Sequence, residues 1–161
     1  MKTRFILLVA LFALVSTTTV SAQFYKCKKV AITEVVDRSE DGDLNDGTKM
    51  FIRSALTDAI TNSDGYEGYD KISFVSLEMN FDRTGSISSA TLTYVRKQLC
   101  DYILISEVTP LDKKSALLSA RIVNTTTGKI VASSSVRAYT DSMDYLRSAC
   151  NNLAYKLVGA I

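Results

Sequence analysis

The chain has 161 residues, of which 47% are hydrophobic and 22% are charged, and its formal net charge is +2. This length and composition suit one folded domain with a hydrophobic core. Histidine is absent from the sequence, which excludes Ser-His-Asp and Cys-His nucleophilic systems and metal sites with histidine ligands. The sequence has no C-x-x-C pair and neither a G-x-G-x-x-G nor a G-x-x-x-x-G-K-[ST] motif, so thioredoxin-type centres and the standard phosphate-binding loops are excluded as well.

The first 22 residues have the pattern of a signal peptide. Lys2 and Arg4 precede an apolar run over residues 5–15, which is too short to span a membrane. The small residues of Val20-Ser21-Ala22 resemble a signal-peptidase site. We therefore expect cleavage after Ala22 and a periplasmic or secreted protein. The alternative is an uncleaved N-terminal anchor.

The expected mature chain consists of a short segment, residues 23–28, and one domain, residues 29–161. Because Lys2 and Arg4 account for the net positive charge, the domain is near neutral and gives no argument for a nucleic acid partner or an anionic membrane. No later apolar run is long enough to predict a transmembrane segment. Cys27 does not directly follow the cleavage site, so no lipoprotein anchor is expected.

The domain begins with a predicted strand over residues 29–37, which are rich in β-branched and apolar side chains. An acidic loop over residues 38–46 follows. Its spacing from Asp37 onward resembles a calcium loop, but Thr48 stands at the twelfth position, where a bidentate glutamate is needed. The loop is therefore interpreted as a solvated connection, and no metal or other cofactor is expected.

A helix is predicted over residues 46–62, with Asp46 as its N-cap and an apolar face of Phe51, Ala55, Leu56, Ala59 and Ile60. A short strand over residues 66–70 comes next. Residues 72–81 are ambiguous between strand and helix, and the spacing of Phe74, Leu77 and Phe81 favours a helix.

A third helix is predicted over residues 90–99, capped by Ser88 or Ser89, with an apolar line of Leu92, Val95 and Leu99. Three strands follow at residues 101–108, 115–124 and 129–136, the last two joined by a turn at Thr127-Gly128. On the middle strand, alternation places Ala116, Leu118, Ala120 and Ile122 toward the core. The chain ends in a helix over residues 141–158 with a buried seam of Met143, Leu146, Cys150, Leu153 and Leu157.

The element order β-α-β-α-α-β-β-β-α predicts an α/β fold with α+β character. Helices between the early strands require crossovers, whereas the three late strands follow one another closely enough for hairpins. We expect a single mixed sheet of about five strands packed by about four helices. In this sheet, the strand over residues 29–37 lies parallel beside the strand over residues 101–108.

Three cysteines, Cys27, Cys100 and Cys150, remain in the expected mature chain. One disulfide and one free thiol is the simplest arrangement for an exported protein. We favour a Cys27–Cys100 pair, because each residue directly precedes one of two strands that we expect to be parallel neighbours. The alternative is three reduced, buried thiols.

Two carboxylates interrupt apolar strands and are the best candidates for an acid–base pair of the kind that cleaves glycosides. These are Glu34 and Glu107, on the first strand and on the strand over residues 101–108. The alternative is that both lie near strand ends and reach solvent or pair with arginine. No residue is assigned a catalytic role.

Asp141-Ser142-Met143 matches the Asp-Ser/Thr-apolar site for O-glycosylation of exported proteins in Bacteroidetes, which makes Ser142 a candidate modification site. The signal peptide, ending Ser-Ala before Gln23, also resembles that phylum's pattern. The alternative for Ser142 is an unmodified helix N-cap.

The sequence resembles the superfamily of CsgG, LpoB and the TolB N-terminal domain over residues 29–159. Members typically carry Gly-Ala-Asp-Tyr-Ile-Leu and later Ala-Arg-Leu-Val-Asp-x-x-Thr-Gly-Glu-Ile-Val-Ala-Ser. The first strand, the RSALTDAI helix and the EMNFDRTG passage also fit. The matching residues of the later strands are Asp101, Tyr102, Glu107, Ala120, Arg121, Val123, Thr127, Gly128, Ile130, Val131 and Ala132.

The resemblance implies a non-catalytic cell-envelope protein that binds other envelope proteins. Members include an outer-membrane secretion channel subunit, an activator of a penicillin-binding protein and a partner of Tol-Pal components. This chain lacks the lipid-anchor cysteine and a long amphipathic insertion for pore strands, so a soluble interaction or assembly module is expected rather than a channel. The alternatives are an envelope glycan-acting enzyme that uses Glu34 and Glu107, or a small-ligand site between sheet and helices.

Overall fold

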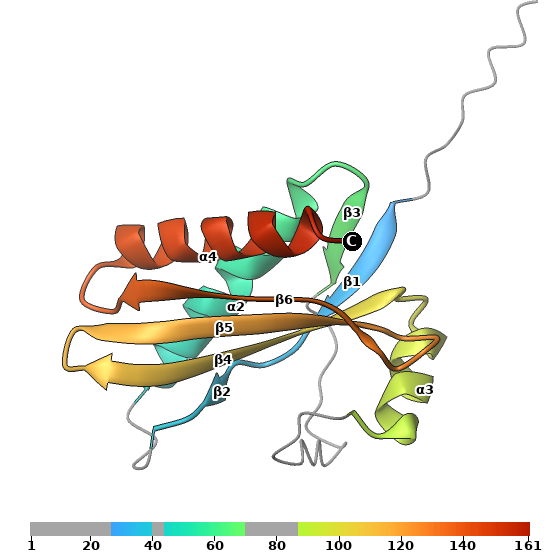
Figure 1. Cartoon of the computed structure of the whole chain (residues 1–161), viewed down its shortest axis with the longest axis horizontal. Helices are drawn as coiled ribbons and strands as arrows, with labels where there is room; N and C mark the ends of the chain where they lie inside the picture. The colour runs from blue at the N-terminus through green and yellow to red at the C-terminus, as the bar shows by residue number, and fades with distance from the viewer. Residues whose placement is uncertain (1–26, 40–43, 70–86) are drawn as a thin grey trace, which may run out of the picture.

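The computed structural model describes residues 27–39, 44–69 and 87–161, which form one six-stranded mixed sheet with helices on both faces (Figure 1). The strands are β1 (Lys28–Ile32), β2 (Val36–Asp37), β3 (Tyr66–Tyr69), β4 (Tyr102–Asp112), β5 (Ser115–Asn124) and β6 (Ile130–Tyr139). The helices are α2 (Asp46–Thr61), α3 (Ser89–Lys97) and α4 (Met143–Val158). The α/β class predicted from the sequence is confirmed. The helix expected over residues 72–81 lies outside the described residues.

The sheet has the strand order β3-β1-β4-β5-β6. The short strand β2 pairs with β4 further along, at Glu107 and Val108. β1 runs parallel to both β3 and β4, as expected from the helical crossovers. β4, β5 and β6 form an antiparallel meander. The late strands extend further than predicted, to Asp112 and Tyr139, because both residues pair with Ser115 at the start of β5.

The strand predicted over residues 29–37 is divided into β1 and β2. Ile32 pairs with Leu104, and Val36 pairs with Glu107. The chain therefore advances four residues from Ile32 to Val36 while β4 advances three. One extra residue in a strand bulges and reverses the alternation of side chains. Val30 and Ile32 point into the main core before the bulge, and Val35 does so after it. The bulge thus explains both the broken strand and the sixth strand of the sheet.

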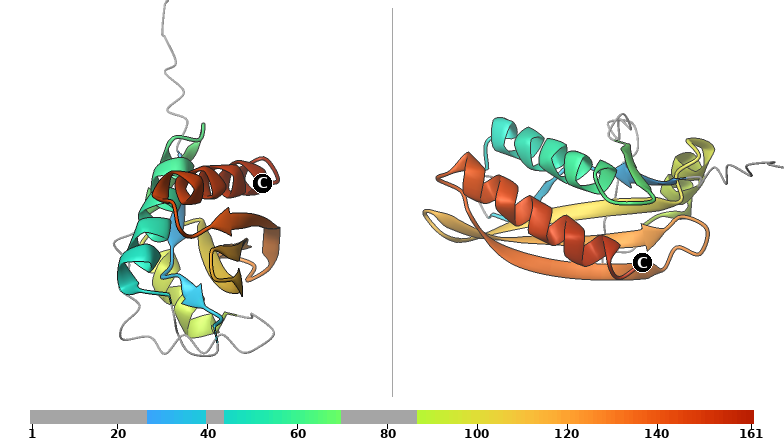
Figure 2. Two further views of the ribbon diagram at one scale, coloured as in Figure 1. Left: turned by 90° about the vertical axis from the view of Figure 1, so that its left-hand side faces the viewer. Right: turned by 90° about the horizontal axis from the view of Figure 1, so that it is seen from above.

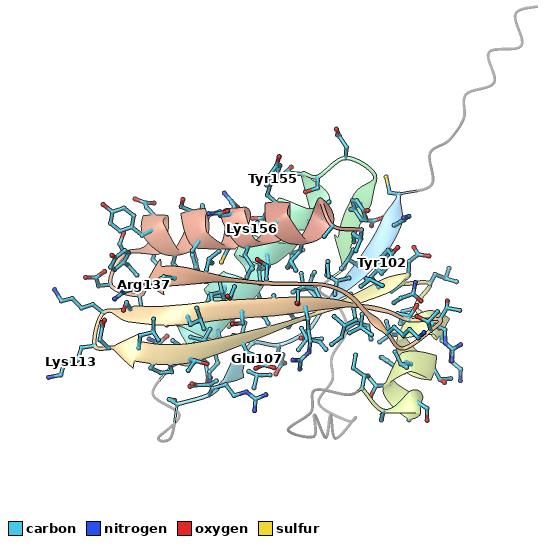
Figure 3. The ribbon with its side chains drawn as sticks, in the orientation of Figure 1. Tyr102, Glu107, Lys113, Arg137, Tyr155 and Lys156 are labelled. Atoms are coloured by element: carbon cyan, nitrogen blue, oxygen red, sulfur yellow. The ribbon has the colours of Figure 1, made fainter. Side chains whose placement is uncertain are left out.

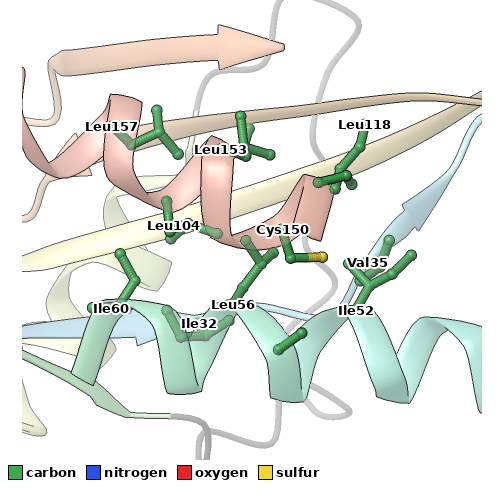
Figure 4. Close-up of a cluster of buried hydrophobic side chains, with 14 of the residues drawn as sticks. Ile32, Val35, Ile52, Leu56, Ile60, Leu104, Leu118, Cys150, Leu153 and Leu157 are labelled. Atoms are coloured by element: carbon green, nitrogen blue, oxygen red, sulfur yellow. The ribbon is translucent and has the colours of Figure 1, made fainter. Parts of the chain in front are cut away.

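Helices α2 and α4 lie side by side on one face of the sheet and enclose the main core (Figures 2 and 4). The predicted core side of β5 is buried, with Leu118 and Ile122 fully covered. Packed side chains from α2, β4, β5 and α4 fill the layer between sheet and helices: Ile52, Leu56, Ile60, Leu104, Leu118, Leu153 and Leu157 are among them. This packing opposes the sequence-based alternative of a ligand site in that layer.

A smaller core lies on the opposite face, where α3 covers one end of the sheet. Val95 of α3 packs there with Ile103 and Val123, and Leu92 lies against them. Leu99, predicted to extend this apolar line, is instead 78% exposed. Its φ angle of 59° belongs to the turn that ends the helix, so the prediction for this residue was wrong.

The helix ends differ slightly from the sequence-based prediction. Asn45, and not Asp46, caps α2, because its side-chain oxygen accepts a hydrogen bond from the backbone N–H of Thr48 at 2.8 Å. Ser88 caps α3 as expected. Met143, placed in the buried seam of α4 by its spacing, is half exposed because it lies in the first turn, before the helix reaches the core. No helix in the described part of the chain has the length and apolarity needed to cross a membrane.

The β5–β6 turn is built by Asn124. Its side-chain oxygen accepts hydrogen bonds from the backbone N–H groups of Thr126 and Thr127, both at 2.9 Å. Gly128 follows with a φ of 69°, a conformation that favours glycine. The turn predicted at Thr127-Gly128 is therefore confirmed.

Candidate functional site

Among the described residues, the face of the sheet opposite α2 and α4 is polar and is covered only at one end, by α3. Because neighbouring strands place directly paired residues on the same face, the register defines two rows across β4, β5 and β6. One row is Ile105, Arg121 and Ser133, and the next is Glu107, Ser119 and Ser135. We call these six residues the open face. Figure 3 shows Glu107 on this side of the sheet, whereas Tyr155 and Lys156 of α4 project on the other.

The open face is hollowed. A shallow, solvent-open depression of about 520 Å³ is lined by all six residues and by Ile130 at the start of β6. Serine hydroxyls come from β5 and β6, and the charged groups come from Glu107 and Arg121. Such a surface offers several hydrogen-bond donors and acceptors around a small apolar floor, which suits a polar partner.

An ionic network holds the centre of the open face. Glu107 Oε2 accepts a hydrogen bond from Arg38 Nε at 3.1 Å, and its Oε1 lies 2.9 Å from Arg121 Nη2. Arg38 reaches the carboxylate because β2 pairs beside β4, so the two arginines approach from opposite sides. The Glu107 and Arg121 side chains are only 19% and 20% exposed. Two guanidinium groups therefore share one carboxylate, and the network carries a net positive charge.

This network sets the protonation of Glu107. Burial alone raises the pKa of its carboxyl, but the hydrogen bond from Arg38 and the charge of Arg121 outweigh burial and hold the pKa below its usual value. Arg121 is less well satisfied, because its Nε is buried and has no hydrogen-bond partner in the part of the chain that the structure describes. Glu107 is thus an ionised anchor for two arginines and is poorly suited to act as a general acid near neutral pH.

Glu34 lies elsewhere. It is exposed in the bulge between β1 and β2 and lines a second hollow of about 350 Å³ with Asp46, Lys49 and Arg53 of α2. The structure therefore does not bring Glu34 and Glu107 together in one cleft, as a glycoside-cleaving pair would require. The alternative interpretation, that such a carboxylate pairs with arginine, holds for Glu107.

Sequence reasoning missed the partners of Glu107. Arg121 was noted as a residue of the middle strand and of the superfamily pattern, but without a partner, and Arg38 was assigned to a solvated loop. The alternation of β5 already placed Arg121 and Ser119 together on the side away from the core, so two of the six open-face residues were available from the sequence. The contribution of Arg38 depends on the pairing of β2 with β4, which no local pattern indicates.

The three cysteines are free thiols in the structure, with Cys27 exposed and Cys100 and Cys150 buried. Burial raises the pKa of Cys100 to about 11 and that of Cys150 to about 12, so both thiols stay protonated and unreactive near neutral pH. The starts of β1 and β4 do adjoin: the Asp101 N–H donates to the Lys29 carbonyl at 2.8 Å. The Cys27–Cys100 pair is not formed here and stays a prediction.

Thiol counting tests this pairing. If the disulfide exists in exported protein, unfolding without reductant should reveal one free thiol, Cys150, and Cys27→Ser should lower the free energy of unfolding by about 2–4 kcal/mol. Cys27→Ser in fully reduced protein is the control, and there we expect little change because Cys27 is exposed. Two or three free thiols in non-reduced protein would refute the pairing.

Ser142 occupies the N-cap position of α4, as its alternative interpretation expected. Its backbone carbonyl accepts from the N–H of Leu146 at 3.0 Å, but its side chain makes no capping hydrogen bond. O-glycosylation of this hydroxyl stays a prediction.

No protein-family model and no curated protein sequence matches the chain. Solved structures do match it. The LpoB C-terminal domain from Escherichia coli superposes with a TM-score of 0.51 and 18% identity, over 80% of this chain and 94% of that one. PelC from Paraburkholderia phytofirmans, solved as a dodecamer, gives a TM-score of 0.52 and 14% identity over 84% and 89% of the two chains.

TolB from Acinetobacter baumannii gives a TM-score of 0.54 with 9% identity, and the match covers 84% of this chain but 29% of TolB. At these identities the comparisons establish a shared fold. The chain therefore has an LpoB-like and TolB-like fold, as the residue pattern of its late strands suggested.

Proposed function

We propose that this protein is an exported, non-catalytic module of the cell envelope that binds another envelope protein through the open face. The observation that carries the proposal is the hollowed polar face, left uncovered by α2 and α4 and organised around Glu107. The signal-peptide pattern supports export to the periplasm or beyond. The fold likeness to LpoB, TolB and PelC supports an envelope role, and the source in Bacteroidetes and the glycosylation of Ser142 belong to the same proposal.

The chemistry of the open face favours binding over catalysis. Its one carboxylate is ionised and held by two arginines, so it has neither the raised pKa of a general acid nor a free partner carboxylate. A depression that is open to solvent also excludes little water, whereas catalytic electrostatics depend on water exclusion. A protein surface that presents hydroxyl and carboxylate groups can pair with the serines and with the excess positive charge of Arg38 and Arg121.

Filling the hollow tests this proposal. Ser119 lies on β5 between Glu107 and Ser135, so Ser119→Tyr should occupy the depression while suiting a β-strand. In affinity capture from envelope extracts of the source cells, we expect a reproducible protein partner with the wild type and at least a tenfold weaker recovery with the variant, equivalent to about 1.4 kcal/mol.

Ser119→Ala is the matched control, because it keeps the hollow open and should retain the partner. Circular dichroism and thermal unfolding of both variants establish that they fold. Equal recovery of the partner by Ser119→Tyr and Ser119→Ala would contradict docking at the open face. Recovery of no reproducible protein partner by the wild type would contradict the interaction module itself.

A further inference from the structure

Strand β6 ends the sheet on one side. Among the described residues, it is hydrogen-bonded only to β5, and it is ten residues long, whereas β3 at the opposite edge has four. Helix α4 packs over the core side of β6, where Ala132 and Ala138 are buried, and leaves the edge itself uncovered (Figure 2). A long edge strand of this kind is a template for pairing with another strand.

The register identifies which backbone groups face outward. The Thr140 N–H donates to the Lys114 carbonyl at 2.9 Å, so the pair of these residues is a hydrogen-bonded one. Hydrogen-bonded pairs recur at every second residue of an antiparallel ladder, so even-numbered residues of β6 bond to β5. The N–H and C=O groups of Ser133, Ser135 and Arg137 therefore point away from the sheet. All three residues are exposed.

Most of the edge lacks the usual protection against pairing, and Arg137, near its end, is the one charged residue of β6. Natural edge strands are blunted by proline, by charged side chains or by a bulge in mid-strand. Residues 130–136 contain no proline and no charge. The register shift of β6 lies at its beginning, where Val131 has no partner on β5, so the strand is regular from Ala132 to Tyr139.

We propose that β6 pairs antiparallel with β6 of a second copy of this chain, centred on Ser135. In this register Ser135 of one copy faces Ser135 of the other, and Ser133 faces Arg137, so all three outward residues exchange backbone hydrogen bonds with a partner. Lys129, just before the strand, and Asp141, just after it, lie at opposite ends of β6, so antiparallel pairing brings Lys129 of one copy near Asp141 of the other at both ends of the pair. No like charges face each other directly across the pair, and the opposite charges at its two ends identify a second copy as the occupant.

The pairing joins two sheets into one and brings two open faces side by side, because Ser133 and Ser135 belong both to the edge and to the hollow. Asp141 already lies 3.8 Å from Lys114, and both are exposed, so this loose contact does not prevent a second one with Lys129. Edge pairing buries little area, which places the dimer among weak and concentration-dependent complexes.

Sedimentation velocity over a series of protein concentrations tests the proposal. We expect the wild type to move from monomer toward dimer as concentration rises. Ser135→Pro should stay monomeric, because it removes an N–H that points to solvent and costs the fold no hydrogen bond to β5. Ser135→Thr keeps the N–H and should dimerise as the wild type does.

Crosslinking provides a test that does not depend on how well the proline variant folds. In a Cys27→Ser background, Ser135→Cys should form a disulfide-linked dimer on mild oxidation, because the two introduced thiols face each other. Ser133→Cys should form little, since its partner in this register is Arg137. Both variants sit on the same exposed strand, so a difference between them reports register rather than accessibility.

A wild type that stays monomeric at every concentration would overturn the proposal, as would a dimer that Ser135→Pro retains in folded form. Equal crosslinking of Ser133→Cys and Ser135→Cys would overturn the register. These outcomes are independent of the proposed function. Dimerisation is measured with variants of β6, whereas binding of an envelope protein by the open face is measured by affinity capture with Ser119→Tyr and Ser119→Ala.

Discussion

Leu118→Ala should lower the free energy of unfolding by about 2–5 kcal/mol. Leu118 is fully buried at the centre of the main core, where α2 and α4 cover β5. The substitution removes buried methyl groups and leaves a cavity that the surrounding strands and helices can fill only in part. Urea unfolding followed by circular dichroism measures the change.

Leu117→Ala is the matched control. It makes the same chemical change one residue away, but Leu117 is half-buried and points to the face opposite α2 and α4. We expect a loss below about 1 kcal/mol, because less apolar surface is returned to water and no enclosed cavity forms. Equal losses for the two variants would contradict the assignment of a covered face and an open face to this sheet.

Glu107→Gln should lower the free energy of unfolding by about 1–3 kcal/mol at pH 7, because it leaves Arg38 and Arg121 without their shared counter-charge in a half-buried site. Glu34→Gln is the control for the same chemical change at an exposed carboxylate, and there a change within about 0.5 kcal/mol is expected. Urea unfolding of both variants beside the wild type measures the difference.

The effect of Glu107→Gln should depend on pH. The pKa of Glu107 is lower in the folded protein than its ordinary value of 4.5, so the folded state holds this proton less tightly than the unfolded state does. The stabilisation is therefore present above the ordinary pKa and is lost as pH falls through the folded one. The gap between wild type and Glu107→Gln should shrink in acid. A gap that is constant from neutral to acidic pH would contradict the ionic network.

The sequence was most informative where burial follows a simple period. The alternation of residues 115–124 predicted which side of β5 faces the core, and the 3–4 spacing of residues 141–158 predicted most of the α4 seam. Local turn chemistry was equally clear at Gly128, where a positive φ is needed. These features depend on neighbours in the chain, so a single sequence contains them.

Features that depend on register between distant strands could not be predicted. The bulge between β1 and β2 exists because two segments of the predicted strand over residues 29–37 pair with β4 out of step, and the local pattern of those residues gives no sign of this register. The same pairing brings Arg38 to Glu107, which turns a suspected catalytic carboxylate into a structural anchor. The predictions that Met143 and Leu99 are buried were wrong for a related reason. Both residues fit the helical spacing, but each lies at a helix end and is exposed to solvent.

The open face and the outer edge of β6 are adjoining surfaces with distinct chemistry. The open face presents side chains, mainly hydroxyls and a positively charged network, whereas the edge presents backbone N–H and C=O groups. A dimer through the edge would display two hollows to a partner at once, and bivalent contact raises apparent affinity without any new interaction. An assembly module would gain from this arrangement even where each single contact is weak.

Site-specific photocrosslinking tests the central claim most directly. A photoreactive amino acid replaces Ser133 on the open face in one strain of the source organism and Tyr155 on the outer surface of α4 in another, and both positions are exposed. We predict that irradiation of intact cells links position 133, but not position 155, to one reproducible envelope protein. The absence of any adduct with another protein from position 133, or the same adducts from both positions, would contradict the account.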